Sequence, residues 1–251
     1  MPRSLTRWTH QRLLAHYGQP IWDSRNQPLD ELVATILSQH TSDRNSERAF
    51  AALKRAYSSW EDVRDAPERE LIEVIRSGGL AVLKAQRIQA VLRALTYEPS
   101  PAAAGEGRVR APTDDIESWA AVHPLPQREG IRLPDLRRMR RSKAVAFLAA
   151  LPGVGRKTAA CVLLFGAHVP AIPVDTHVHR VALRVGLVPA RTAPDAACDL
   201  LEAAIPPAKQ YAFHVNVIRL GREICKARRP HCQVCPLAER CAFTKAMSLT
   251  S

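Results

Sequence analysis

The residues best suited to chemistry gather in one stretch, Leu-Pro-Gly-Val-Gly-Arg-Lys-Thr at residues 151–158. We expect an apolar helix over residues 142–150 to run into the proline, and a second helix to occupy residues 155–165. Gly153 and Gly155 allow backbone angles that residues with a β-carbon resist, and their amides can approach a phosphate closely. The free amides and positive dipole end of the second helix also suit an anion. The stretch therefore predicts a tight hairpin that can bind an anion.

Two charged side chains next to this hairpin are candidates for a chemical role. Arg156 and Lys157 fall in the first turn of the second helix, where a cation opposes the helix dipole. A sequence that breaks a local rule in this way often does so at a functional site. Asp175 lies farther along the chain, just before an expected helix over residues 176–185. Its structural role would be to cap that helix, and the cap would also fix the position of its carboxylate.

Four of the six cysteines follow a C-x6-C-x2-C-x5-C spacing: Cys225, Cys232, Cys235 and Cys241. Four thiolates this close in sequence can surround one metal centre, and a structural zinc ion is the simplest occupant. The C-x2-C pair alone does not distinguish zinc from an iron–sulfur cluster. Lys226, Arg228 and Arg229 lie in the six-residue interval, where they could contact phosphates or be solvated. We expect Cys161 and Cys198, outside the pattern, to be buried thiols.

The composition limits the class of protein. The chain has 251 residues, of which 46% are hydrophobic, and a formal net charge of +12. This charge favours a polyanion such as DNA or RNA as partner over a membrane surface. No apolar run reaches the ~18 residues that a membrane span needs, and the first residues lack the apolar core of a signal peptide. We therefore expect a cytoplasmic protein that binds no membrane and, in a bacterium, associates with the nucleoid.

The hairpin stretch, the segment Val174–His177 and the cysteine spacing together resemble the helix-hairpin-helix superfamily of base-excision DNA glycosylases and AP lyases, and within it the endonuclease III family. The resemblance implies that Lys157 is the lysine that attacks the deoxyribose C1′ and that Asp175 is the catalytic aspartate. It implies a [4Fe-4S] cluster on the four cysteines. It also implies that Gly153, Gly155 and Arg156 contact DNA.

The expected fold class is all-α, because every element that we assign has helical periodicity and no stretch alternates with period two. The resemblance implies two lobes. The first covers residues 23–169 and ends in the helix-hairpin-helix, and the second joins residues 1–22 to residues 170–251 and holds the cluster. Residues 97–140 are an expected insert, which begins with a linker rich in proline and glycine at residues 97–114.

One polar segment between expected helices, residues 38–43, could be an ordinary capped turn. By the resemblance, this turn enters the duplex and fills the gap left by a flipped base. His40 matches the position of the gap-filling residue. The family usually has glutamine there, so Gln39 is the alternative.

A second candidate contact is Leu80, which follows the pair Gly78–Gly79. A leucine in this position would ordinarily belong to the core. In the family, the matching leucine is a wedge that parts the base opposite the lesion, where an apolar contact offsets the loss of stacking. Lys84 and Arg87, in a helix expected over residues 84–95, would then hold phosphates or form a solvated face.

The resemblance implies a bifunctional DNA glycosylase and AP lyase of base excision repair that acts on oxidised pyrimidines, such as thymine glycol, in double-stranded DNA. The base would be flipped out, released with help from Asp175, and the strand cleaved through a Schiff base on Lys157. One alternative is an adenine or uracil/thymine mismatch glycosylase, although such relatives usually lack the hairpin lysine. The other is a non-catalytic DNA-binding protein with a structural zinc ion. We expect a monomer.

Overall fold

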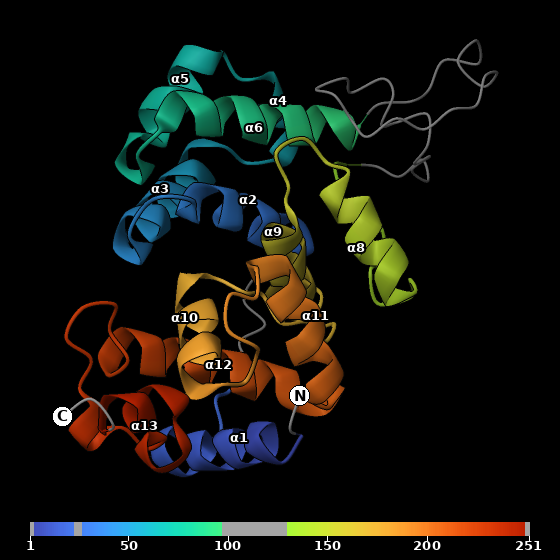
Figure 1. Cartoon of the computed structure of the whole chain (residues 1–251). Coiled ribbons are helices and arrows are strands. Elements are labelled where there is room, and N and C mark those ends of the chain that lie inside the picture. Colours follow the sequence, from blue (N-terminus) through green and yellow to red (C-terminus); the bar gives the residue numbers. More distant parts are fainter. Residues whose placement is uncertain (1–2, 23–26, 97–129, 249–251) are drawn as a thin grey trace. The chain divides into compact units, whose positions relative to one another are not determined.

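The structure is a computed structural model that describes residues 3–22, 27–96 and 130–248. Within these ranges every regular element is helical, which confirms the expected all-α class (Figure 1). The expected linker at residues 97–114 and most of the insert lie outside the described residues. No helix in the described part of the chain is long and apolar enough to cross a membrane.

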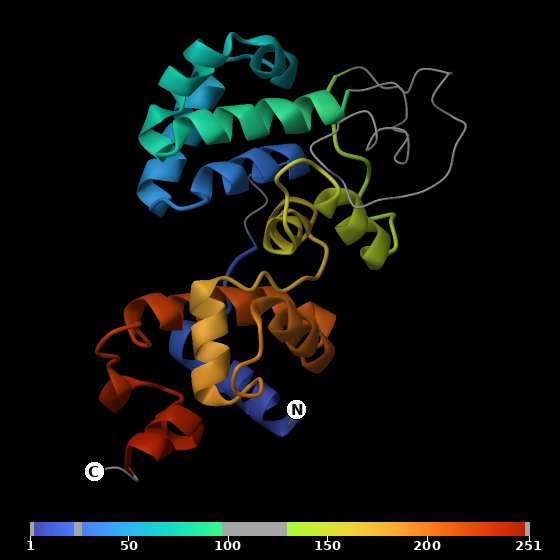
Figure 2. The same ribbon diagram turned by 45° about the horizontal axis from the view of Figure 1, so that its top comes forward.

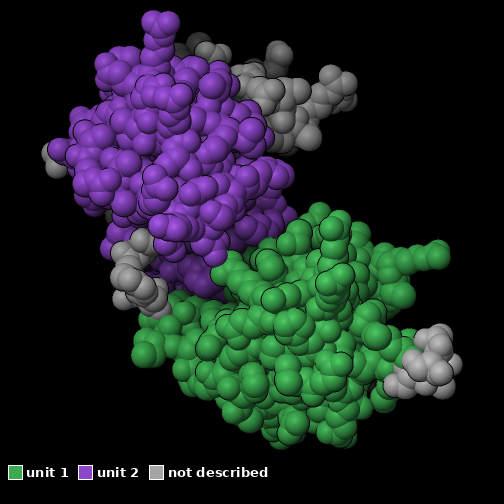
Figure 3. All heavy atoms as spheres, turned by 90° about the vertical axis from the view of Figure 1, so that its left-hand side faces the viewer, with its two compact units in different colours: residues 1–23, 170–251 green, residues 24–169 purple. Residues whose placement is uncertain are grey.

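The chain divides into two compact units, which we describe separately (Figure 3). Unit 1 comprises residues 1–23 and 170–251, and unit 2 comprises residues 24–169. Lys157 therefore belongs to unit 2, whereas Asp175 and the four clustered cysteines belong to unit 1.

Unit 2 is built around α2, which contacts α3, α6, α9 and η3. Leu32, Val33, Ile36 and Leu37 of α2 are fully buried, so almost every turn of this helix faces other elements. Its elements in chain order are α2 (Pro28–Ser38), α3 (Asp43–Ala56), α4 (Trp60–Asp65), α5 (Glu68–Val74), η1 (Arg76–Gly78), α6 (Ala81–Ala94), α8 (Arg141–Ala149), α9 (Arg156–Cys161) and η3 (Val162–Gly166).

The helix expected over residues 155–165 is two elements in the structure. Regular α-helix α9 ends at Cys161, and η3 continues as a π-helix, which is wider than an α-helix. Gly166 ends η3 against the start of α2, where an added β-carbon would lie 2.8 Å from Pro28 Cα and 3.0 Å from Glu31 Cβ. Glycine at this position therefore allows η3 to approach α2 closely.

Unit 1 is centred on α12, which contacts α1 and α10 (Figure 2). The N-terminal helix thus packs in the same core as the C-terminal part, around the fully buried Phe213. Both α11 and α12 begin with proline, whose fixed φ angle suits the first helical position. The elements are α1 (Arg3–Tyr17), α10 (Thr176–Val185), α11 (Pro194–Ala204), α12 (Pro207–Glu223), η4 (Cys232–Val234), η5 (Ala238–Arg240) and α13 (Ala242–Ser248).

The close approach at Gly166 predicts a measurable loss of stability. We expect Gly166→Ala to lower the free energy of unfolding by about 2 kcal/mol, because the backbone of α2 cannot move aside for the new methyl group. Gly155→Ala is the matched control, since its β-carbon would meet no atom within 4 Å and its φ is −85°. Urea denaturation followed by circular dichroism measures both. A smaller loss for Gly166→Ala than for Gly155→Ala would contradict the packing described here.

Candidate active site and nucleic-acid interface

The hairpin before α9 is held by two buried residues and one conformationally required glycine. Leu151 and Val154 are buried, and the Val154 amide donates to the Leu151 carbonyl over 3.1 Å. Gly153, between them, has φ +69°, a conformation that favours glycine. Gly155 does not meet the expectation of an unusual backbone angle, because its φ is −85°. A β-carbon there would point into open space, so the absence of a side chain instead leaves the start of α9 accessible to a ligand.

Lys157 is the second residue of α9, and its side chain is exposed. Among the described residues it forms no hydrogen bond or ion pair. Arg156 and Lys157 both lie in the first turn of α9, as expected. This turn contains no acidic residue, so the two cations oppose the helix dipole there. The lysine amine is therefore available to an external electrophile.

Asp175 caps α10, as expected from the sequence. Its Oδ1 accepts hydrogen bonds from the amides of His177 (2.9 Å) and Val178 (2.7 Å). These two bonds fix the half-buried carboxylate at the start of the helix. The second oxygen, Oδ2, accepts neither bond. One oxygen thus positions the group, and the other can stabilise a positive charge that develops nearby.

The two candidates for filling a gap in the duplex both lie in the turn between α2 and α3, but their side chains have different surroundings. Gln39 accepts a hydrogen bond from Arg87 Nη1 over 2.8 Å and donates to Thr158 Oγ1 over 3.5 Å. His40 is exposed with φ +53°, and the structure records no hydrogen bond of its side chain among the described residues. This arrangement favours His40 over Gln39 as the residue that reaches DNA.

Leu80 is not a core residue, so the interpretation of this leucine as part of the core was wrong. Its side chain is 55% exposed, and its φ of +49° places it in the left-handed region just before α6. Val82 and Leu83, in the first turn of α6, are also exposed. Three exposed apolar side chains in four residues form a surface suited to contact with an apolar or aromatic partner.

Lys84 does not hold a phosphate, which corrects the expectation for this residue. The helix α6 begins at Ala81 rather than at Lys84, and Lys84 faces the interior of unit 2, where it is only 1% exposed. Its Nζ donates to the carbonyls of Leu37 and Gly78, each over 2.7 Å. Burial lowers the pKa of Lys84 below the usual lysine value. The periodicity of α6 gave no sign that a lysine faced the interior.

Four cysteines of unit 1 lie close enough to affect one another's ionisation. Burial, and then the negative charges of Cys225 and Cys241, raise the pKa of Cys232. Burial likewise raises the pKa of Cys235, with smaller contributions from the same two neighbours and from Cys232. No three side chains in the described ranges are spaced to hold a single metal ion. Four mutually interacting thiols nonetheless provide the all-sulfur donor set that an iron–sulfur cluster requires.

Two arginines of α10 hold the loop that follows Cys225. Arg180 donates to the carbonyl of Cys225 over 2.9 Å, and Arg184 donates to the carbonyls of Lys226 (2.7 Å) and Ala227 (3.0 Å). Arg184 also lies 3.5 Å from the Cys225 sulfur. Their i, i+4 spacing on α10 was the only signal in the sequence, and it did not reveal that their partners are carbonyls.

The side chains on that loop are free to meet a polyanion. Lys226, Arg228 and Arg229 are all exposed, while the backbone beneath them is fixed by the arginines of α10. A loop that presents three cations on a fixed backbone suits phosphate contacts, because binding costs it little further backbone conformational entropy.

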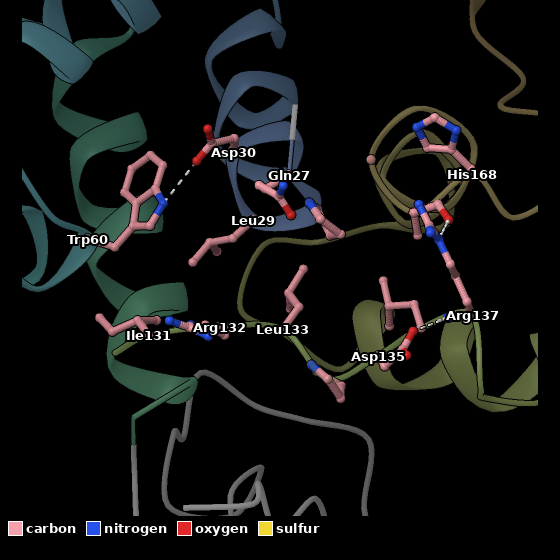
Figure 4. A pocket seen from close by; sticks show the side chains of 15 residues that line it. Gln27, Leu29, Asp30, Trp60, Ile131, Arg132, Leu133, Asp135, Arg137 and His168 are labelled. Carbon is pink, nitrogen blue, oxygen red and sulfur yellow. Dashed lines mark hydrogen bonds between the residues drawn. The ribbon is translucent and has the colours of Figure 1, made fainter. Parts of the chain in front are cut away.

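A cavity in unit 2 lies elsewhere. It has a volume of about 810 Å³ and is lined by residues of α2, the segment before α8 and the end of η3 (Figure 4). At its wall Asp30 accepts a hydrogen bond from Trp60 Nε1 over 3.0 Å. None of the candidate site residues lines it.

Two protein-family models match the chain. Residues 33–207 match the HhH-GPD superfamily of base excision DNA repair proteins. Residues 225–241 match the iron-sulfur binding domain of endonuclease III. The second match covers the four cysteines from the first to the last, and it shows that the protein carries an iron–sulfur cluster, which is of the [4Fe-4S] type in this family.

Curated relatives and solved structures agree with these matches. The chain is 32% identical to endonuclease III of Thermotoga maritima over 216 residues, which cover 86% of this chain and 83% of the relative. It is 30% identical to endonuclease III of Bacillus subtilis, over 85% and 80% of the two chains.

A solved non-covalent endonuclease III–DNA complex aligns with a TM-score of 0.74 and 26% identity, over 99% of both chains. A trapped covalent endonuclease III–DNA intermediate gives the same values. A thermostable thymine-DNA glycosylase, at 19% identity and a TM-score of 0.67, shares the fold. The chain therefore belongs to the endonuclease III family of the HhH-GPD superfamily of base excision DNA repair proteins.

Proposed function

We propose that the protein is a bifunctional DNA glycosylase and AP lyase that removes oxidised pyrimidines of the thymine glycol type from double-stranded DNA and cleaves the strand at abasic sites. The observation that carries this proposal is Lys157, an exposed amine without a partner among the described residues, at the helix start that follows the hairpin. A monofunctional glycosylase needs no such amine. The proposal includes a cytoplasmic location and a monomeric state. Light scattering of the purified protein tests the monomeric state.

The first chemical step requires access to the sugar. C1′ is inaccessible inside a duplex, so the damaged nucleotide must be flipped out. As the bond from C1′ to the base breaks, its electrons leave with the base, which takes up a proton, and positive charge develops on the sugar. The carboxylate of Asp175 stabilises this charge through Oδ2, the oxygen that accepts neither hydrogen bond of the α10 cap.

The second step uses Lys157 as nucleophile. The neutral amine attacks C1′, loses a proton and, as the sugar ring opens, becomes a Schiff base. Loss of a proton from C2′ then expels the phosphate from C3′ by β-elimination, which breaks the strand. Hydrolysis of the conjugated imine returns the free lysine. Every bond change is accounted for by water, one amine and one carboxylate.

The remaining candidate residues bind DNA. Leu80 is proposed as the wedge and His40 as the gap-filler, because both are exposed and both lie at left-handed turns. Gly153, Gly155 and Arg156 are proposed to receive a phosphate at the hairpin. The cluster supplies no step in this scheme, and its role when bound is to fold the loop that carries the three cations.

Replacing the nucleophile should abolish the covalent intermediate. A Schiff base between protein and DNA can be reduced by borohydride to a permanent cross-link, and Lys157→Gln keeps a polar side chain but has no amine. We expect the cross-link to vanish in this variant. Lys143→Gln, which alters an exposed lysine of α8, is the control and should cross-link as the wild type does. Persistent cross-linking by Lys157→Gln would show that another amine attacks C1′.

Replacing the carboxylate should act differently on the two activities. Asparagine caps a helix about as well as aspartate, so Asp175→Asn should keep its melting temperature. Loss of the charge should slow base release by about 10²–10³-fold, the usual cost of removing one electrostatic stabiliser of a transition state. Cleavage at a pre-formed abasic site should suffer less, because the opened aldehyde develops no such charge. Equal losses in the two assays would mean that Asp175 also moves a proton of Lys157.

The cations after Cys225 should contribute to the salt dependence of binding. Replacing Lys226, Arg228 or Arg229 by glutamine should weaken binding to all DNA sequences alike and lower the slope of log K against log salt by about 1 per lost contact. Lys209→Gln is the control, because this exposed lysine lies at the opposite end of α12, about 21 Å along the helix axis from the end that leads into the loop. Unchanged slopes for all three variants would leave the loop as a solvated structure.

A further inference from the structure

Lys84 is a buried cation for which the proposed chemistry has no use. It is among the largest side chains in the described part of the chain that are almost fully removed from solvent. Burying an ammonium group is costly unless its donors are satisfied. Here Nζ makes two short hydrogen bonds, to the carbonyls of Leu37 and Gly78, each 2.7 Å long.

The two carbonyls belong to separate segments, and each stands at the end of a helix. Leu37 lies in the last turn of α2, and Gly78 is the last residue of η1. Carbonyls at helix ends lack an intrahelical partner, and the negative end of the helix dipole favours a cation. A single ammonium group thus satisfies the ends of two helices at once and ties them together.

Each of these helix ends leads directly into a residue proposed to enter DNA. His40 follows α2 after Gln39 and has φ +53°, and Leu80 follows η1 after Gly79 and has φ +49°. A residue with a β-carbon in this conformation costs roughly 1–2 kcal/mol and persists where the surrounding structure imposes it. The two strained, exposed residues therefore stand on turns that are anchored by one buried lysine.

The packing around the lysine leaves these turns little freedom. A β-carbon on Gly78 would lie 3.1 Å from Ala49 Cβ of α3, so the backbone at Gly78 is already in close contact with that helix. The amide of Lys84 itself donates to the Leu80 carbonyl over 3.0 Å, which starts α6. Lys84 is therefore bonded to the Leu80 turn through its backbone and to both turns through its side chain.

We propose that Lys84 is a positioning residue that fixes the spacing between the His40 turn and the Leu80 turn, so that gap-filler and wedge enter the duplex together. This inference rests on the proposed function, which assigns the two roles. The physical benefit is preorganisation. Two turns that moved independently would each lose conformational entropy on entering the base stack, whereas linked turns have lost it already on folding.

The test removes the ammonium group and follows entry into the duplex directly. Lys84→Met keeps an unbranched stem and deletes Nζ. The probe is a duplex with a tetrahydrofuran abasic analogue opposite 2-aminopurine, whose fluorescence rises when the base is unstacked. At saturating protein we expect the rise seen with the wild type to be largely lost. Gln86→Met, at an exposed position of the same helix, should behave as the wild type.

A general loss of structure would affect every substrate, whereas loss of positioning would not. We expect Lys84→Met to slow base release from a thymine glycol duplex by about tenfold or more, as a small misplacement of a positioned group can. Strand cleavage at an abasic site in single-stranded DNA, which has no stack to part, should change little. Equal losses on the two substrates, or an undiminished 2-aminopurine signal, would overturn the inference.

A double variant shows whether Lys84 acts through Leu80. If it does, Leu80→Ala/Lys84→Met should lose little more duplex activity than Leu80→Ala alone, and additive losses would refute the coupling. Should Lys84→Met fail to fold, Lys84→Gln retains two N–H donors on a shorter stem and undergoes the same comparisons. A wild type that releases no base would defeat the proposed function. An active wild type with equal losses in the variant would defeat only the role of Lys84.

Discussion

The satisfaction of helix ends is the constraint on which this structure depends. An all-α protein has many helix termini, and each leaves amides or carbonyls without an intrahelical partner. In this chain the groups that satisfy those ends are also the groups that place the candidate site. Asp175 accepts hydrogen bonds from two amides in the first turn of α10, and Lys84 donates hydrogen bonds to carbonyls at the ends of α2 and η1. The energetic requirement of folding and the geometric requirement of the site are met by the same side chains.

In unit 1 this constraint connects the carboxylate to the cluster loop. Asp175 fixes the start of α10, and farther along the same helix Arg180 and Arg184 bind carbonyls that follow α12. The Cys241 sulfur lies 3.2 Å from the Arg184 carbonyl oxygen, so the last cysteine is also packed against α10. One ten-residue helix thus sets the position of the carboxylate, the cysteine loop and the three exposed cations. A displacement of the cluster loop would therefore alter hydrogen bonds made by α10.

The sequence predicted the parts of this arrangement that depend on local chemistry. The bounds of α10 and the Asp175 cap follow from a capping residue placed before a regular apolar pattern, and the structure has both as expected. The cysteine cluster needed only residue type and spacing. The burial of Lys84 could not be predicted, because it depends on carbonyls contributed by other segments, and backbone groups leave no trace in a sequence. The prediction of an unusual backbone angle at Gly155 was wrong for a related reason. Glycine can be required for its backbone conformation or for the space that its missing side chain leaves, and only the observed φ angle distinguishes the two.

The hydrogen bonds of Gln39 bear on the turn after α2, where this chain has His40 at a position that is usually glutamine in the family. Gln39 is occupied between Arg87 and Thr158, and Thr158 is the neighbour of Lys157 in α9. The aliphatic stem of Arg87 in turn lies against Gly153, where an added β-carbon would be 3.1 Å away from it. Gln39 therefore joins the turn to the hairpin and to the helix of the proposed nucleophile, and it could reach into DNA only by breaking both bonds. This supports the proposal that its exposed neighbour, His40, fills the gap, since an imidazole can donate and accept hydrogen bonds as the usual glutamine does.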